Sequence, residues 1–137
     1  MSFTVLTIAT ACLLDEAGRI LVVRKRGTSN FMLPGGKIEG AETSMDAVRR
    51  ELEEELGLTM ESSTLEPLGH FSSRAANEPG HWVEADVFTG RVTSSVRAQA
   101  EIEAVAWIEL HAEPDVALAP LLREQVVPAL RRRLGAA

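Results

Sequence analysis

The sequence contains no tyrosine, only one cysteine and no apolar run long enough to cross a membrane. Because Cys12 has no second cysteine to pair with, an internal disulfide is excluded and a reducing compartment is expected. The most apolar stretch, residues 5–14, has ten residues, whereas a transmembrane helix needs about 20. It also lacks the basic start of a secretory signal. We therefore expect a cytoplasmic protein with no membrane partner.

Long basic runs are also missing, and the charge balance is acidic, with a formal net charge of -6. Bulk electrostatics therefore argue against nucleic acid as a partner. An acidic protein that handles anionic substrates would need metal ions or a few local basic residues. At 137 residues, with 45% apolar and 25% charged residues, the chain fits one soluble domain, 1–137, with a buried core. The oligomeric state is left open, a homodimer included.

Hydrophobic patterning predicts strands interleaved with two helical segments. The strands are expected at 3–14, 19–26, 65–74, 81–92 and 103–110. Residues 15–18 form a turn that makes the first two strands a hairpin, and residues 77–80 join a second pair. A helical pattern also covers 118–134, where Pro128 removes one backbone hydrogen bond and should kink the helix or divide it in two. This order of elements predicts an α/β or α+β domain.

The other helix is expected at 43–56. Thr43 and Asp46 have the spacing of a capping box, with aspartate in place of the usual glutamate or glutamine. Gly57 is placed to end the helix in a left-handed conformation. The apolar stripe of this helix consists of Met45, Val48, Leu52 and Leu56.

Four glutamates lie in the last two turns of this helix. Glu51 stands three and four residues before Glu54 and Glu55, so these three side chains are neighbours, whereas Glu53 points toward solvent. A solvated acidic face is the common explanation for such a run. However, like charges four residues apart destabilise a helix by about 0.2–0.5 kcal/mol, and acids in the last turn oppose the helix dipole by roughly 0.3–1 kcal/mol each. A divalent cation would remove both penalties, so geometry alone leaves both interpretations open.

The residues around the glutamates form a longer pattern. From Gly36 the chain reads GKIEGAETSMDAVRRELEEELGL, and this segment, residues 36–58, resembles the Nudix box G-x5-E-x7-R-E-U-x-E-E-x-G-U, in which U is aliphatic. Every defined position is filled, by Gly36, Glu42, Arg50, Glu51, Leu52, Glu54, Glu55, Gly57 and Leu58. Weaker resemblance extends over residues 31–42 and 101–110. Ala41 stands where many members have glycine, which bears only on the local loop shape.

The resemblance implies the Nudix fold, a mixed β-sheet sandwiched between α-helices. It also implies a pyrophosphohydrolase that uses Mg²⁺ or Mn²⁺ to cleave a nucleoside diphosphate linked to another moiety. Glu51, Glu54 and Glu55 are the metal ligands that the resemblance implies, and one glutamate assists the attacking water. Which glutamate does so is left open. Glu101 is a candidate for a further ligand from a later loop, although Glu103 is just as close in sequence.

Other residues are expected to orient these groups or to bind substrate. Arg50 stands four residues before Glu54 and can pair with it, either as a surface ion pair or, as the family context favours, to orient the carboxylate for catalysis. Glu42 is expected to be a supporting ligand or an orienting group. Gly35 and Gly36 are expected to form a turn without side chains that lets the loop and the metal approach closely.

Two further side chains are candidates for substrate binding. Arg24 and Arg26 share one face of their strand, and Arg26 is the candidate for meeting substrate phosphates, although solubility of an edge strand is the commoner use of such residues. Phe31 stands where the family often has an aromatic residue. It could stack on a base, although core packing is the commoner role of phenylalanine.

The substrate class follows by elimination. Diadenosine polyphosphate hydrolases of this family often carry a tyrosine downstream of the box, and this chain has none. ADP-ribose hydrolases of the family often carry a proline near the position of Arg74, where none stands. We therefore expect a nucleoside triphosphate, oxidised ones included, with ADP-ribose or a nucleotide sugar as the alternative. A Nudix-fold nucleotide-binding module without turnover is a further alternative, but such modules usually lose the box acids.

Overall fold

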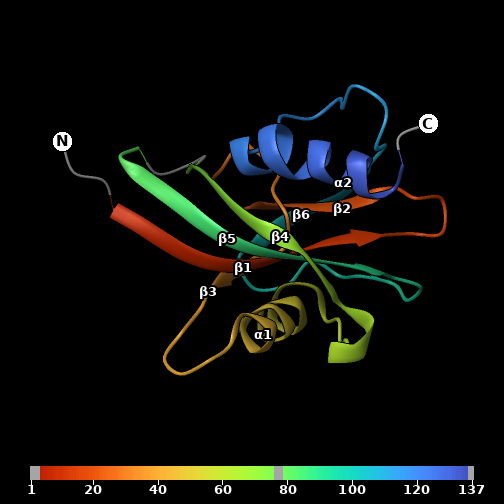
Figure 1. Ribbon diagram of the computed structural model, residues 1–137. Helices are drawn as coiled ribbons and strands as arrows, with labels where there is room; N and C mark the ends of the chain where they lie inside the picture. Colours follow the sequence, from red (N-terminus) through yellow and green to blue (C-terminus); the bar gives the residue numbers. More distant parts are fainter. Residues whose placement is uncertain (1–3, 76–78, 136–137) are drawn as a thin grey trace.

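A computed structural model describes residues 4–75 and 79–135 as a six-stranded mixed sheet with helices on both faces (Figure 1). The strands are β1 (Thr4–Leu14), β2 (Ile20–Lys25), β3 (Gly35–Lys37), β4 (Glu66–Arg74), β5 (His81–Arg91) and β6 (Ile102–Ile108). The helical elements are α1 (Ser44–Leu56), the 3-10 helix η1 (Ser62–Thr64), the π-helix η2 (Leu121–Val126) and α2 (Val127–Arg133). The strand order is β4-β5-β1-β2-β6, and β3 pairs with β1. The mixed sheet between helices is confirmed.

The central strand β1 explains the apolar run near the start of the chain. It runs parallel to β5 over its whole length, from Thr4 opposite His81 to Leu14 opposite Arg91, and antiparallel to β2 and β3. Successive side chains of a strand point to opposite faces of the sheet. Because helices cover both faces, every residue from 9 to 14 is buried.

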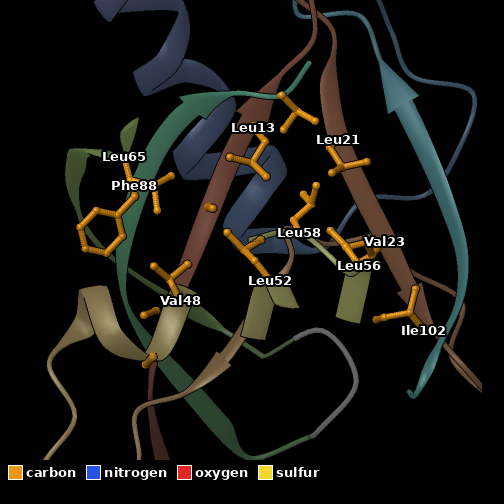
Figure 2. Packing of buried hydrophobic residues seen from close by; sticks show 14 residues of the cluster. Leu13, Leu21, Val23, Val48, Leu52, Leu56, Leu58, Leu65, Phe88 and Ile102 are labelled. Carbon is orange, nitrogen blue, oxygen red and sulfur yellow. The ribbon is translucent and has the colours of Figure 1, made fainter. Parts of the chain in front are cut away.

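Helix α1 covers one face of the sheet (Figure 2). Its apolar stripe places Val48, Leu52 and Leu56 in a cluster with Leu13 of β1 and Leu21 of β2. Burying each such side chain contributes roughly 1.5–3 kcal/mol. The stripe therefore fixes which side of α1 faces the sheet, and the glutamates between these positions must lie along its margin.

Both ends of α1 are capped as the sequence predicts. The Thr43 hydroxyl accepts a hydrogen bond from the Asp46 backbone N–H at 3.1 Å, and the Thr43 N–H donates to the Asp46 carboxylate at 3.2 Å. Gly57 has a φ of 67°, and its N–H donates to the Glu53 carbonyl at 3.0 Å. Because only glycine adopts this left-handed conformation without strain, Gly57 sets the length of the helix.

The opposite face of the sheet is covered by η2 and α2. Leu122, Val126 and Leu130 are buried in a second apolar cluster that includes Cys12 and Val22. Burial raises the pKa of the Cys12 thiol to about 12. The thiol therefore stays protonated at neutral pH and acts as a small apolar core group.

The predicted helical segment is divided in two near Pro128, and its two parts are different kinds of helix. Residues 121–126 have π-helical winding, and residues 127–133 are α-helical, with Pro128 in the first turn of the α-helix. The missing N–H of proline is tolerated in a first turn, because those N–H groups have no partner within their own helix.

Two features differ from the sequence prediction. Gly35 and Gly36, which were expected to form a turn, are instead the first two residues of β3, which pairs with residues 8–10 of β1. Strand β2 lies between β1 and β6, so the explanation of its basic residues by an edge strand is wrong.

Asn77 and Glu78, in the predicted second turn, lie outside the described residues. No helix among the described residues is long and apolar enough to cross a membrane.

Candidate catalytic and metal-binding site

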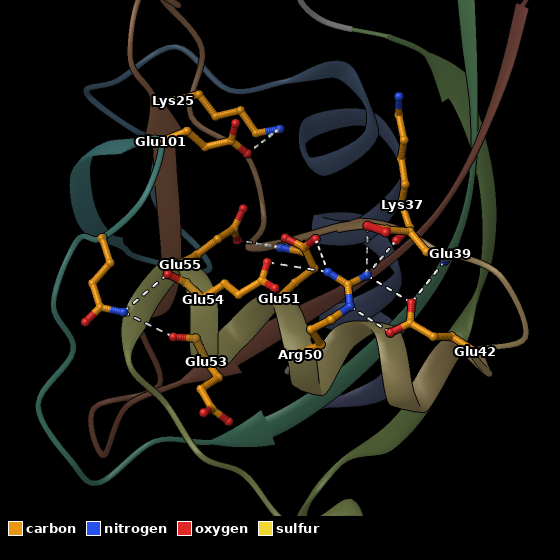
Figure 3. Close-up of polar contacts among 12 residues, drawn as sticks. Lys25, Lys37, Glu39, Glu42, Arg50, Glu51, Glu53, Glu54, Glu55 and Glu101 are labelled. Atoms are coloured by element: carbon orange, nitrogen blue, oxygen red, sulfur yellow. Dashed lines mark hydrogen bonds and ion pairs between the residues drawn. The ribbon is translucent and has the colours of Figure 1, made fainter.

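The three glutamates of the candidate metal site lie along one side of α1 (Figure 3). Their exposed fractions differ sharply, because the side of α1 that carries them extends from the sheet to the solvent. Glu55 is only 2% exposed, whereas the side chains of Glu51 and Glu54 are 13% and 54% exposed. Glu53 points away from this group, as predicted (Figure 3). The acids therefore form a graded series from the core to the surface.

Glu55 is a buried carboxyl group with only one of its two oxygens satisfied. Its Oε1 accepts a hydrogen bond from the Gly35 N–H at 3.0 Å, and its Oε2 is buried without a partner among the described residues. Burial is the main cause that raises the pKa of Glu55, to about 8, and the nearby Glu51 charge adds to it. An unpaired buried carboxylate oxygen is unfavourable unless a cation or a donor binds it.

Two glycines allow this close packing of loop and helix. Gly35 has a φ of 147°, which side chains rarely permit, and a Cβ there would collide with the backbone oxygen of Ala9. A Cβ on Gly36 would lie 2.6 Å from the Glu51 carboxyl carbon. The absence of side chains at these two positions of β3 is therefore needed for two different contacts, one with β1 and one with the acidic side of α1.

Arg50 ties the box residues together. Its Nε and Nη2 donate to the two carboxylate oxygens of Glu42 at 2.7 and 2.9 Å. Its Nη1 donates to Glu51 at 2.8 Å and lies 3.4 Å from Glu54, and its Nη2 also reaches the Lys37 carbonyl at 3.1 Å. Arg50 therefore contacts Glu54, as expected, but its shorter bonds are to Glu42 and Glu51.

These contacts bear on the two roles expected for Glu42. The hydrogen bonds from Arg50, followed by one from the Glu39 N–H, lower the pKa of Glu42 to about 2. The same pairing raises the pKa of Arg50. A carboxylate with both oxygens on one guanidinium is fixed in direction. In this arrangement Arg50 binds both oxygens of Glu42, which favours the orienting role over that of a supporting ligand.

Lys25 and Glu101 lie beside the acidic residues of α1. Lys25 Nζ is 3.4 Å from Glu101 Oε1, and both charges act on Glu55, where Lys25 lowers the pKa and Glu101 raises it. Glu103 instead pairs with Arg24 at 2.8 Å. Of the two candidates for an additional acid, Glu101 is therefore the one near the site.

The sequence prediction named Arg24 and Arg26 and did not assign a role to Lys25. Alternation along β2 places Lys25 on the face of Leu21 and Val23, which pack against α1, and its amine reaches Glu101. The Arg26 side chain is exposed, and its backbone N–H donates to the Glu101 carbonyl at 2.8 Å. Both faces of β2 are apolar, so the sequence of the strand does not show which face meets α1.

A cavity of about 380 Å³ adjoins β3 on the face of the sheet that η2 and α2 cover. Its apolar lining comes from Leu6, Ile8, Met32, Leu33, Ala75, Val83, Ala119, Leu121 and Leu122. Lys25, Lys37 and Arg74 also line it. Thr10 lines it as well, and its hydroxyl is buried without a hydrogen-bond partner among the described residues. Phe31, the expected stacking residue, is not part of this lining and packs in the second apolar cluster.

The cavity and the acidic side of α1 meet at the two glycines of β3. Gly35 and Gly36 both line the cavity, while the Gly35 N–H contacts Glu55 and Gly36 faces the Glu51 carboxylate. A molecule could therefore place an organic group in the cavity and an attached anion beside the glutamates.

The chemistry of these acids suits a hard divalent cation. Carboxylate oxygens are preferred ligands of Mg²⁺ and Mn²⁺, and the unpaired Glu55 oxygen offers one ligand that nothing else in the structure uses. In the residues that the structure describes, however, no three His, Cys, Asp or Glu side chains converge closely enough to hold a metal ion. Arg50 occupies Glu51 and approaches Glu54. These two carboxylates would have to turn toward Glu55 for a cation to bind.

Comparison with known proteins gives the family. The NUDIX domain model matches residues 5–130. The chain belongs to the Nudix family. An ADP-ribose pyrophosphatase of Methanocaldococcus jannaschii is 26% identical over 113 residues, which are 80% of this chain and 66% of that protein. A MutT-like protein of Streptomyces ambofaciens is 32% identical over 94 residues, 68% of this chain and 56% of that protein.

This Nudix chain thus spans two thirds or less of the curated relatives that it matches. Among solved structures, the MutT protein from Methanosarcina mazei Go1 superposes with a TM-score of 0.78. The alignment covers 97% of this chain and 98% of that chain at 24% identity, so it shows a shared fold.

Proposed function

We propose that this Nudix protein is a metal-dependent pyrophosphohydrolase that cleaves a nucleoside diphosphate linked to another moiety. The observation that carries the proposal is the buried, half-satisfied carboxyl group of Glu55 beside Glu51, on a helix with a complete Nudix box. Leaving this group unpaired destabilises the free protein. A binding partner of positive charge would remove that penalty.

Glu51, Glu54 and Glu55 are the proposed ligands of Mg²⁺ or Mn²⁺, and Glu101 is a proposed additional ligand from the start of β6. A cation bound there would supply neutralisation of the phosphate oxygens and a lowered pKa for bound water. Lys25, which now pairs with Glu101, offers a positive charge to phosphate oxygens at the same place. Carboxylates on one capped helix hold their positions better than carboxylates on loops.

Arg50 and Glu54 have distinct proposed roles in the reaction. Arg50, fixed by both oxygens of Glu42, holds Glu51 in direction through the 2.8 Å bond. Glu54 is the most exposed of the three acids and has only a 3.4 Å contact with Arg50. It is therefore the group best able to turn toward an attacking water and accept its proton. A mutation of either residue should affect turnover more than folding.

The cavity supports an assignment for the organic part of the substrate. Its volume of about 380 Å³ lies in the range of small-molecule sites, and its aliphatic lining suits the flat faces of a base. Lys37 lies at the junction between cavity and acids, where an attached phosphate would pass. In this arrangement the nucleoside occupies the cavity and the scissile anhydride lies near Glu51 and Glu55.

Nucleoside triphosphates, oxidised ones included, are the proposed substrate class. An aliphatic cavity suits one nucleoside, whereas the second sugar of ADP-ribose would need further polar partners. ADP-ribose is the second candidate, and the name of the Methanocaldococcus jannaschii relative favours it. The two candidates give different products, since triphosphates release phosphate or pyrophosphate and ADP-ribose releases AMP and ribose phosphate.

A nucleotide panel assayed with and without Mg²⁺ tests both levels of the proposal. Hydrolysis that requires Mg²⁺ and is lost in Glu54→Gln, but kept in Glu53→Gln, would support the proposed site. Glu53 is a matched control because it belongs to the same helical turn but points away from the other acids (Figure 3). Hydrolysis confined to ADP-ribose would overturn the triphosphate assignment. Tight nucleotide binding without turnover on any substrate would contradict the proposed enzyme.

A further inference from the structure

The carbonyl end of α1 has an unusual arrangement of partners. The last four carbonyl groups of a helix have no partner within it, and basic residues commonly offset their negative charge. In α1 the last turn carries Glu53, Glu54 and Glu55 and no basic residue. Besides the Gly57 N–H, which donates to the Glu53 carbonyl, the donors come from a different part of the chain, the segment 97–101 before β6.

Gln99 provides most of these donors. Its side-chain Nε2 donates to the carbonyls of Glu53 and Glu54 at 3.1 and 3.2 Å, and its backbone N–H donates to the Glu55 carbonyl at 2.9 Å. The Arg97 N–H completes the set with the Leu56 carbonyl at 3.2 Å. All four terminal carbonyls are thus bound by this segment.

The side chain of Gln99 lies directly over the end of the helix. A Cβ built on Gly57 would be 3.3 Å from the Gln99 amide oxygen, which is tighter than most side-chain contacts. The glycine therefore has a second role besides its left-handed conformation. It leaves room for the amide to approach the carbonyls of the two glutamates.

The same segment delivers Glu101 to the site. After Gln99 the chain turns through Ala100, whose φ of 53° is the only positive value of a non-glycine residue among the described residues. The turn is closed by a hydrogen bond from the Ile102 N–H to the Gln99 carbonyl at 3.0 Å. Glu101 is then held by its carbonyl, which accepts from the Arg26 N–H at 2.8 Å, and its carboxylate pairs with Lys25. Strained backbone of this kind is often found at functional sites.

We propose that Gln99 is a positioning residue for the acidic site: its amide locks the carbonyl end of α1 to the segment that carries Glu101, so that acids from two distant parts of the chain keep a fixed spacing. The inference rests on the proposed function, because it concerns the same metal site. The segment is attached at two points. Gln99 binds the carbonyl end of α1, and Glu101 pairs with Lys25 of β2. An ordinary helix cap would need only the hydrogen bonds of Gln99 to α1.

The test compares Gln99→Met with Gln125→Met. Methionine has nearly the length of glutamine, carries no charge and cannot donate, so the change removes the two amide hydrogen bonds without altering the electrostatics of the acids. Gln125 is an exposed glutamine of η2 and serves as the matched control. For each protein we would measure Mn²⁺ affinity by electron paramagnetic resonance, kcat/KM at saturating Mn²⁺, the melting temperature, and amide hydrogen exchange.

We expect Gln99→Met to weaken Mn²⁺ binding about tenfold and to lower kcat/KM about tenfold, each equivalent to about 1.4 kcal/mol. Amide exchange should rise only in the last turn of α1 and at 97–102, and Gln125→Met should match the wild type throughout. If Gln99→Met changes melting temperature or exchange but leaves Mn²⁺ affinity and kcat/KM intact, Gln99 is only a helix cap and the proposal is wrong. Unchanged exchange would also overturn it.

The two proposals fail in different ways. A wild-type protein that binds Mn²⁺ but hydrolyses no nucleotide contradicts the proposed enzyme, while the Mn²⁺ and exchange measurements still decide the role of Gln99. A wild-type protein that binds no Mn²⁺ overturns both. Equal behaviour of Gln99→Met and wild type in an active enzyme overturns only the positioning role.

Discussion

Replacing Glu55 by glutamine should stabilise the metal-free protein at high pH. The buried carboxyl group has a pKa of about 8, whereas an ordinary glutamate has a pKa near 4.5. Between these values the folded protein keeps a proton that the unfolded chain releases, so the free energy of unfolding falls as the pH rises. Because one pKa unit corresponds to about 1.36 kcal/mol, this one group should remove about 4 kcal/mol between pH 5 and pH 9.

Glutamine keeps the main contact of the native residue but cannot ionise. Its side-chain oxygen can still accept the hydrogen bond from the Gly35 N–H that Glu55 accepts at 3.0 Å. The variant and the wild type should therefore have similar stability near pH 5. By pH 9 the variant should melt about 12 °C higher, since 1 kcal/mol corresponds to roughly 3 °C for a domain of this size.

The assay is thermal unfolding in a chelating buffer from pH 5 to pH 9, with Glu53→Gln as the control. The control removes one carboxylate from the same turn, but an exposed one, so its melting curve should parallel that of the wild type. Added Mg²⁺ should raise the melting temperature of the wild type at pH 8 and should not raise that of Glu55→Gln. Parallel curves for all three proteins without metal would refute the reasoning about burial.

Three further substitutions separate function from folding. Gly36→Ala places a Cβ 2.6 Å from the Glu51 carboxyl carbon. Because the carboxylate can turn aside, the melting temperature should change by less than about 3 °C, while kcat should fall about 100-fold. An unchanged kcat would contradict the close approach. Arg50→Lys cannot hold both oxygens of Glu42, so kcat should fall about 10- to 100-fold with little loss of secondary structure by circular dichroism; full activity would rule out the orienting role. Thr10→Val removes an unpaired buried hydroxyl, so the melting temperature should stay the same or rise by about 2–4 °C, while kcat/KM should fall about tenfold. A lower melting temperature would show that the hydroxyl has a hydrogen-bond partner in the free protein.

The local features of the site could be predicted because they depend on residues close in sequence. The capping box of Thr43 and Asp46 follows from a spacing of three residues, and Gly57 marks the end of α1. The grouping of Glu51 with Glu54 and Glu55 follows from helical periodicity alone. The long apolar run near the start of the chain similarly predicts a strand, and the structure confirms it as β1.

Contacts between distant segments could not be predicted from one sequence. The position of Lys25 beside the acids depends on which face of β2 meets α1, and this is set by the place of the strand in the sheet. The pairing of Arg50 with Glu42 depends on how the loop before α1 folds back along the helix. The unpaired Thr10 hydroxyl is recognisable only after the strands and η2 enclose a cavity. In each case the geometry is set by tertiary packing, for which local propensity gives no signal.

The sequence predicts that Glu51, Glu54 and Glu55 converge on a cation. In the structure, protein groups already bind two of these carboxylates. Glu55 is held by the Gly35 N–H, and Glu51 is held by Arg50. These protein partners stand where a cation would compete for the carboxylates. A cation at the proposed site would therefore require Glu51 and Glu54 to reorient, which a static helical wheel does not reveal.

The most direct test of the metal assignment is anomalous diffraction from crystals soaked with Mn²⁺ and a non-hydrolysable nucleotide analogue. The proposed site predicts a manganese peak that is coordinated by Glu55 and by at least one of Glu51 and Glu54, next to the phosphates of the analogue. A peak at another place, or an ordered analogue with no peak at these carboxylates, would contradict the assignment of α1 as the metal-binding helix.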